Sequence, residues 1–237
     1  MKRAAAAEAL SWVRSGMRLG LGTGSTMAHF IHLLGERIRD GALSGVVGVP
    51  TSIQTADRAH AVGIPLGPLH ELAPLDLTVD GADEVGPKLD LIKGLGGALL
   101  REKMVAVASR RFLVVADESK RVQRLGTRAP VPVEVATFAW QIHFPFLESL
   151  GARPVLRTHT DGAPSPTDNG NYVIDCFFPS GLPDPAGVDA EIRGRVGVVE
   201  TGLFLGLASH AVIAGEDGLT VLKATGGPPP LSEAGSR

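Results

Sequence analysis

The chain has 237 residues, a length that allows one full domain and at most a smaller second one. Hydrophobic residues make up 44% of the chain and charged residues 20%, so it can bury a sizeable core and is not disordered as a whole. A net charge of −2 and an aromatic content of 5% argue against nucleic acid as the main partner, because they supply neither a basic footprint nor stacking platforms.

The first residues and the single cysteine bear on location. Glu8 and Arg14 interrupt the alanine-rich start, so we expect no signal peptide. The sequence has no apolar run of about 18 residues, so we also expect no membrane-spanning helix. Cys176 has no partner for an intramolecular disulfide, and we interpret it as a small buried hydrophobic residue. A cytoplasmic location is the simplest expectation.

Short β-branched runs alternate with helical patterns over the first two-thirds of the chain, which is typical of a parallel sheet covered by helices. In chain order we expect a helix at 2–14, a strand at 17–22, a helix at 25–39, a strand at 46–49, a helix at 51–63, a strand at 76–80, a helix at 98–109 and a strand at 112–116. Ser25 is expected to cap the second helix, and Thr51 with Gln54 to form a capping box for the third. This order predicts a Rossmann-like α/β domain.

Prolines punctuate the chain near residue 130, and a different rhythm follows. The expected elements are a strand from 133, a helix at 136–150, strands at 153–158 and 172–177, a helix at 184–194 and a strand at 196–200, with an exposed hairpin at 161–170. Two helices among four strands predict a smaller α+β, ferredoxin-like lid or oligomerisation domain at 130–202.

Strand-like runs at 209–214 and 219–223 are expected to return to the first sheet. The first domain would therefore comprise residues 1–129 plus 203–224. The remaining residues, 225–237, lack apolar periodicity and are predicted to form a disordered tail.

The segment Gly22-Thr23-Gly24-Ser25-Thr26 lies between an expected strand and an expected helix. Its glycines allow close backbone approach, and a helix start offers N–H groups and the positive end of the dipole to a phosphate. The alternative is an ordinary tight turn with a serine cap. Met27 occupies the third glycine position of a dinucleotide fingerprint, so that motif is absent.

The segment Asp80-Gly81-Ala82-Asp83-Glu84 follows the third expected strand. Ligands of open α/β sheets bind outside the carboxyl ends of the strands, so Asp80 and Asp83 are candidates to face a ligand. Acidic oxygens also suit Mg²⁺ or Ca²⁺, although the EF-hand spacing is absent, and a solvated acidic turn is the remaining alternative.

Two further segments combine lysine with glycine or acidic residues. Lys93-Gly94-Leu95-Gly96-Gly97 precedes the helix that carries Glu102 and offers a second anion-compatible cradle. Glu102 in a first helical turn also has a plain interpretation as a dipole partner. Lys120 follows another core strand, and its alternative is an ordinary surface lysine.

Together the motifs GTGST, VDGADE, KG-x-GGA-x-x-REK and ADESK, in this order, resemble type A ribose-5-phosphate isomerase. The similarity continues through residues 48–52, 132–134, 167–170 and 201–204, and covers residues 2 to about 223. The family interconverts ribose 5-phosphate and ribulose 5-phosphate, in the pentose phosphate pathway of carbohydrate metabolism, through an enediol and without metal or organic cofactor.

The resemblance implies specific roles. The family's general base corresponds to Glu102, and Asp80, Asp83 and Lys93 correspond to its other catalytic residues. The implied substrate-binding residues are Thr23, Gly24, Ser25, Thr26, Asp80, Gly81, Ala82, Asp83, Lys93, Gly94, Leu95, Gly96 and Lys120, with Lys2 at the distance of a further family lysine. The family's dimers and tetramers imply a homodimer or homotetramer.

Two positions depart from the family pattern, Leu95 within the glycine loop and Leu100 before the REK motif. If position 95 has a positive φ, leucine there costs roughly 1 kcal/mol or more. A non-catalytic sugar-phosphate sensor is the alternative function, since a fold does not determine a function. Such sensors usually carry a DNA-binding module, and with roughly twenty residues before GTGST and a net charge of −2 we expect none here. Another phosphosugar enzyme, such as a deaminase or lactonase, is a third possibility.

Overall fold

The computed structural model describes residues 1–225 of the chain. No helix within that range is both long and apolar enough to cross a membrane. The chain forms two compact units, which are described separately: the first comprises residues 1–82, 101–119 and those from 206 onward, and the second 83–100 and 120–205. Beyond Thr225, the tail expected at 225–237 lies outside the described residues.

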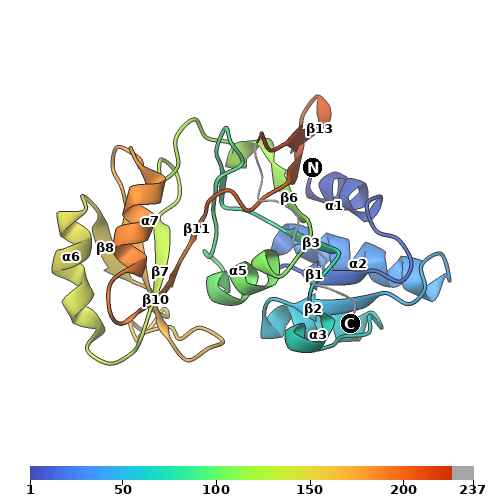
Figure 1. Ribbon diagram of the computed structural model, residues 1–237, viewed down its shortest axis with the longest axis horizontal. Coiled ribbons are helices and arrows are strands. Elements are labelled where there is room, and N and C mark those ends of the chain that lie inside the picture. Colours follow the sequence, from blue (N-terminus) through green and yellow to red (C-terminus); the bar gives the residue numbers. More distant parts are fainter. Residues whose placement is uncertain (226–237) are drawn as a thin grey trace, which may run out of the picture. The chain divides into compact units, whose positions relative to one another are not determined.

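The first unit is built on a six-stranded sheet with the order β13-β12-β6-β3-β1-β2. Its strands are β1 (Arg18–Leu21), β2 (Val47–Pro50), β3 (Leu77–Asp80), β6 (Phe112–Asp117), β12 (His210–Gly215) and β13 (Gly218–Lys223). Neighbouring strands are parallel except β12 and β13, which form an antiparallel hairpin (Figure 1). The predicted parallel sheet is confirmed, as is the return of the C-terminal strands to it.

The helices are α1 (Lys2–Leu10), α2 (Ser25–Arg39), α3 (Ile53–Ala61), α4 (Leu69–Leu72) and α5 (Leu99–Val107). Phe30, Ile31 and Leu34, whose spacing predicted α2, are buried in one core with the sheet residues Leu19 and Val79. Helix α1 adds three buried alanines to that core and packs on α2. The prediction of α2 over 25–39 matches the structure; α4 had no recognised signal.

The helix ends differ from the sequence-based expectation at three places. Helix α1 ends at Leu10 rather than near residue 14, because Ser11 turns its N–H and hydroxyl onto the Glu8 carbonyl and closes a tighter turn. Gly24, at φ +118°, is the N-cap of α2, whereas Ser25 is its first helical residue and makes no capping bond. Ser52 caps α3 by accepting from the Thr55 N–H at 3.0 Å, so the predicted Thr51 capping box is wrong.

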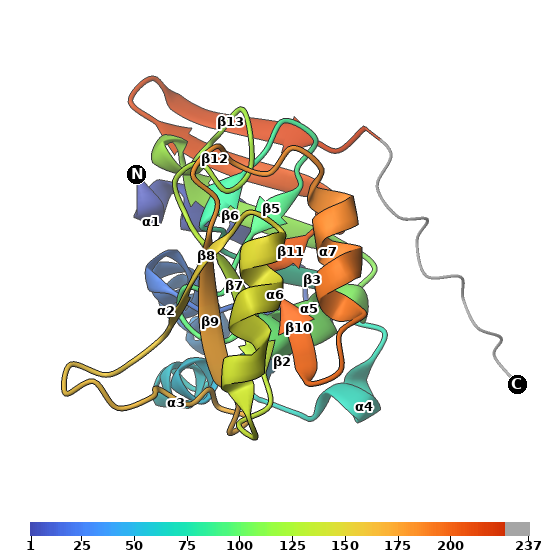
Figure 2. The same cartoon turned by 90° about the vertical axis from the view of Figure 1, so that its left-hand side faces the viewer.

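The second unit contains a four-stranded antiparallel sheet with the order β10-β7-β9-β8. Its strands are β7 (Val131–Val135), β8 (Arg153–Leu156), β9 (Tyr172–Phe177) and β10 (Val198–Thr201). Helices α6 (His143–Ser149) and α7 (Pro185–Arg193) lie side by side in the same unit (Figure 2). In chain order the elements run β7-α6-β8-β9-α7-β10, so the predicted ferredoxin-like arrangement is confirmed.

Two features of the second unit differ from the prediction made from the sequence. The helix expected at 136–150 begins only at His143, because Ala139 adopts φ +50° and a 3₁₀ turn at Trp140–Ile142 intervenes. A three-stranded sheet pairs β4 (Glu84–Val85), β5 (Leu91–Ile92) and β11 (Leu203–Phe204). The second unit includes residues 83–100, 120–129 and 203–205, which the sequence had assigned to the first domain.

Candidate active site

Asp80 ends strand β3 of the first unit and is fully buried. Its Oδ1 accepts hydrogen bonds from the backbone N–H groups of Thr23, at 3.1 Å, and Gly81, at 2.7 Å. Gly22 leaves room for this carboxylate, since a Cβ there would lie 2.1 Å from Asp80 Oδ1. The first two sequence motifs therefore meet at one carboxylate, because β1 and β3 are adjacent parallel strands.

Four hydroxyl groups hold the loop after β1. Thr23 Oγ1 lies 2.7 Å from Thr51 Oγ1, 2.9 Å from Ser52 Oγ and 3.3 Å from Thr55 Oγ1. Thr51 and Thr55 donate in turn to the carbonyl oxygens of Leu21 and Gly22, at 3.1 and 3.0 Å. The three supporting side chains are buried, so the 22–26 loop rests on a rigid polar base.

The start of α2 carries Gly24, Ser25 and Thr26. The first N–H groups of a helix have no intrahelical partner, so this start is suited to an anion. Lys2 in α1 donates through Nζ to Ser25 Oγ at 2.8 Å, which places an ammonium group beside that helix start. The structure thus places Lys2 at the 22–26 loop, as its distance from GTGST in the sequence had suggested.

Glu102 lies in the first turn of α5 and is 4% exposed. A carboxylate that serves only the helix dipole can stay in solvent, whereas burial of a charge is costly. Lys103 beside it is also buried. The burial of Glu102 therefore favours a chemical role over the plain dipole interpretation.

In the second unit, Asp83 faces the glycine-rich loop. Its N–H donates to Ile92 O at 2.8 Å, and its Oδ2 accepts from the Leu95 N–H at 3.0 Å. Lys93 is 2% exposed, with Nζ 5.5 Å from the centroid of the Phe204 ring. The Lys93 N–H donates to Gly202 O at 2.9 Å. The second and third motifs are thus joined within this unit.

Glycine is required at two positions of the 93–97 loop, Gly94 at φ +105° and Gly97 at φ +79°. Leu95 is not among the residues with positive φ, and its side chain is 43% exposed. The strain considered for a leucine at this position is therefore absent. The guanidinium of Arg157 donates to the carbonyl oxygens of Gly94, at 2.9 Å, and Leu95, at 3.2 Å.

The remaining predicted residues have fewer partners. Gly81 and Ala82 continue from Asp80 and are half-buried. Lys120 ends the 3₁₀ turn Glu118–Lys120, and within residues 1–225 its ammonium makes no hydrogen bond or ion pair. Gly96 is exposed at the tip of its loop.

Sequence reasoning missed the groups that support these loops. Thr51 and Ser52 lie in a stretch that carried the family resemblance, but their link to Thr23 had no local signal. Arg157 and its partner Asp175 are far from the glycine loop in the chain, and no motif connected them to it. Cys176 is fully buried, as predicted.

Comparisons with known proteins agree with this architecture. A profile described as "Ribose 5-phosphate isomerase A (phosphoriboisomerase A)" matches residues 47–218. Ribose-5-phosphate isomerase A of Roseiflexus castenholzii is 54% identical over 94% of each chain, and that of Chloroflexus aurantiacus is 50% identical over 92% of this chain and 91% of that protein. A solved D-ribose-5-phosphate isomerase in complex with phospho-erythronic acid is 41% identical, with a TM-score of 0.91 over 94% of this chain and 97% of that one. The isomerase from Methanocaldococcus jannaschii aligns with a TM-score of 0.89, over the same shares of the two chains.

The mostly parallel sheet and the separate small antiparallel sheet match the solved isomerases, so the chain has the α/β fold of that class of enzyme. The sequence similarity extends over nearly the whole chain and over nearly the whole of its relatives. The chain belongs to the ribose 5-phosphate isomerase A family.

Proposed function

We propose that the chain interconverts D-ribose 5-phosphate and D-ribulose 5-phosphate in the non-oxidative branch of the pentose phosphate pathway, with Glu102 as the general base. Membership of the family supports the reaction. The observation that carries the assignment of the base is the burial of the Glu102 carboxylate in the first turn of α5.

Aldose–ketose conversion needs one base that acts at two neighbouring carbons. Glu102 removes the proton from C2, the C–H electrons form a C1–C2 double bond, and the carbonyl electrons move to O1. The carboxylic acid then returns the proton to C1, while O2 loses its proton and becomes the carbonyl oxygen. General-base catalysis of this kind contributes about 10²–10⁴-fold.

The proton that O1 gains and O2 loses needs a relay. Asp80 and Asp83 are suited to it because backbone N–H groups hold each carboxylate in place. We assign the relay to these two residues, together with assistance in opening the ring form of the sugar.

The negative charge of the enediolate needs fixed donors. Lys93 supplies a nearly buried ammonium group, and its loop supplies the N–H groups of Gly94 and Gly96, since the Leu95 N–H donates to Asp83 and the Gly97 N–H to Gly94 O. A charge interaction is stronger in such a desolvated setting than in water. We therefore assign stabilisation of the enediolate to Lys93 and its loop.

The phosphate is remote from the reacting carbons and holds the sugar in register. We assign its binding to Thr23, Gly24, Ser25 and Thr26 at the start of α2, with Lys2 beside Ser25. Lys120 is the further cation that we assign to the substrate. Phospho-erythronic acid, the ligand bound in the solved relative, carries a phosphate and a carboxylate. We propose that this chain binds the same acid.

We further propose a cytoplasmic enzyme that assembles as a homodimer or homotetramer. Side chains and backbone groups of the chain are assigned to every proposed step, so the proposed reaction uses no metal or organic cofactor.

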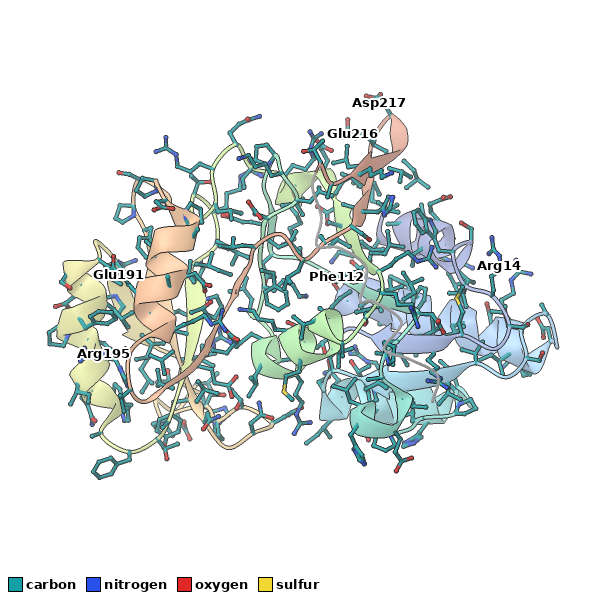
Figure 3. All side chains as sticks on the ribbon, in the orientation of Figure 1. Arg14, Phe112, Glu191, Arg195, Glu216 and Asp217 are labelled. Atoms are coloured by element: carbon teal, nitrogen blue, oxygen red, sulfur yellow. The ribbon has the colours of Figure 1, made fainter. Side chains whose placement is uncertain are left out.

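The test compares Glu102→Gln with Glu191→Gln, an exposed control on α7 (Figure 3). Ribose 5-phosphate is followed by NMR in deuterated water, which reports both ketose formation and solvent exchange at the transferred position. We expect Glu102→Gln to bind ribose 5-phosphate by calorimetry but to turn over about 10²-fold more slowly or worse.

Turnover of Glu102→Gln equal to that of Glu191→Gln would remove Glu102 from the mechanism. Binding without conversion by the unmodified chain would support the sensor instead. A product other than the ketose would indicate a different phosphosugar enzyme.

A further inference from the structure

Arg157 links the small sheet of the second unit to the 93–97 loop. It follows β8, and its Nε and Nη2 donate to the two carboxylate oxygens of Asp175 on β9, at 2.9 and 2.5 Å. Its Nη1 donates to the carbonyl oxygens of Gly94 and Leu95. The side chains of Arg157 and Asp175 are only 18% and 16% exposed, so this charged bridge is largely shielded from water.

The bridge determines the direction of two N–H groups. In a planar trans peptide the carbonyl and the following N–H point in opposite directions. Because the Gly94 carbonyl accepts a hydrogen bond from Arg157, the Leu95 N–H of the same peptide unit points away from Arg157. That N–H donates to Asp83 Oδ2 at 3.0 Å. The Leu95 carbonyl on Arg157 likewise turns the Gly96 N–H away. Gly96 is exposed, and its N–H makes no hydrogen bond within residues 1–225.

An ion pair that served only to join β8 and β9 would not need the additional hydrogen bonds from Arg157 to the Gly94 and Leu95 carbonyl oxygens. Asp175 already faces Val155 of β8 and Pro132 of β7 in the sheet register, so the strands are aligned without the loop contacts. Arginine presents its donors in a rigid fork, whereas lysine has one flexible ammonium group. The fork is what allows one side chain to hold a carboxylate on one side and two carbonyl oxygens on another.

We propose that Arg157, held by Asp175, is a positioning residue for the isomerase reaction. It fixes the peptide units 94–95 and 95–96, so that the Leu95 N–H holds Asp83 and the Gly96 N–H is presented to the negative oxygen of the enediolate. This inference rests on the proposed function. The guanidinium acts through the loop rather than on the substrate.

The test compares Arg157→Gln with Arg153→Gln. Arg153 begins β8, the strand that Arg157 follows; its side chain is exposed, and its Cζ lies 4.9 Å from the centroid of the Phe177 ring. Misplacing donors by about 1 Å, or losing one, reduces turnover by about 10²-fold. We expect kcat of Arg157→Gln to fall by roughly 10–100-fold, with KM for ribose 5-phosphate changed by less than about threefold.

Inhibitors separate positioning from a general loss of structure. The inhibition constant of phospho-erythronic acid should rise by the factor by which kcat/KM falls, because a carboxylate, like the enediolate, is a planar anion that needs the same N–H donors. Inhibition by inorganic phosphate should stay unchanged. Arg157→Lys keeps the charge without the fork and should show the same pattern, which keeps the test valid if Arg157→Gln does not fold.

The inference is overturned if folded Arg157→Gln or Arg157→Lys matches the kcat of Arg153→Gln. It is also overturned if KM for ribose 5-phosphate and inhibition by phosphate deteriorate together with kcat. An unmodified chain that binds ribose 5-phosphate without converting it contradicts the proposed function, which is a separate outcome.

Discussion

Replacing Gly22 with alanine should expose the close packing of Asp80 in the first unit. The added Cβ would lie 2.1 Å from Oδ1, 2.2 Å from Cγ and 2.5 Å from Cβ of Asp80. Favourable carbon contacts lie near 3.5–4.0 Å, so the methyl group is more than about 1 Å too close. Asp80 cannot move aside without weakening its bonds from the Thr23 and Gly81 N–H groups.

Overpacking costs about 1–3 kcal/mol, and a hydrogen bond to a charged group contributes about 1.5–3 kcal/mol. We therefore expect Gly22→Ala to lower the free energy of unfolding by about 2–4 kcal/mol. At about 2–4 °C per kcal/mol for a chain of this size, the fall in Tm is roughly 5–15 °C.

Thermal unfolding followed by circular dichroism measures this shift, with Gly81→Ala as the matched control. A Cβ at Gly81 would meet only Val115 O at 3.8 Å and Thr23 O at 3.9 Å, which are ordinary contacts. Its Tm should therefore be unchanged or slightly raised, because alanine restricts the unfolded chain. A Gly22→Ala protein that melts within about 2 °C of the control would refute the reasoning.

Two further expectations concern titrating groups of the second unit. Burial, and secondarily the charge of Asp175, raises the pKa of the Cys176 thiol. We therefore expect no labelling of Cys176 by a thiol reagent at pH 8 until guanidinium unfolds the chain. Stoichiometric labelling of the native protein would contradict this expectation. Burial, and secondarily the charge of Arg195, lowers the pKa of His143, whose Nδ1 accepts from Arg195 Nε at 3.3 Å. The unfolded chain then binds the extra proton first, so stability should fall as the pH drops below about 6.5 toward the lowered folded pKa. His143→Gln should flatten this dependence of Tm on pH, and a slope equal to that of the exposed variant His60→Gln would exclude His143 as its source.

The sequence predicted elements well where periodicity and buried runs coincide. Helix α2 and strand β9 have the expected bounds, because an apolar stripe or a β-branched run continues through each element. The predicted bounds are wrong where a local backbone interaction or conformation interrupts the helix. The hydrogen bond from Ser11 to Glu8 O ends α1 early, and the positive φ of Ala139 delays the start of α6. The two-residue strands β4 and β11 are too short to show any period.

The chemistry-bearing residues were visible in the sequence because each motif follows the end of a strand or begins a helix. Glu102, Asp80, Asp83 and Lys93 were named from such motifs, and their roles remain proposals. Their settings were not visible in it. The burial of Glu102 and the ordinary φ of Leu95 depend on how distant segments pack, which residue order does not reveal.

The sequence by itself determined the class of fold, the family and the residues able to hold or move a proton, since these follow from local pattern and side-chain chemistry. Only the tertiary structure decided which groups support them. The hydroxyl groups of Thr51 and Thr55 lie 28 and 32 residues from Thr23, and Arg157 lies 63 residues from Gly94. A hydrogen bond requires a separation near 3 Å and a set direction, and residues so far apart in the chain reach that geometry only when folding brings their segments together.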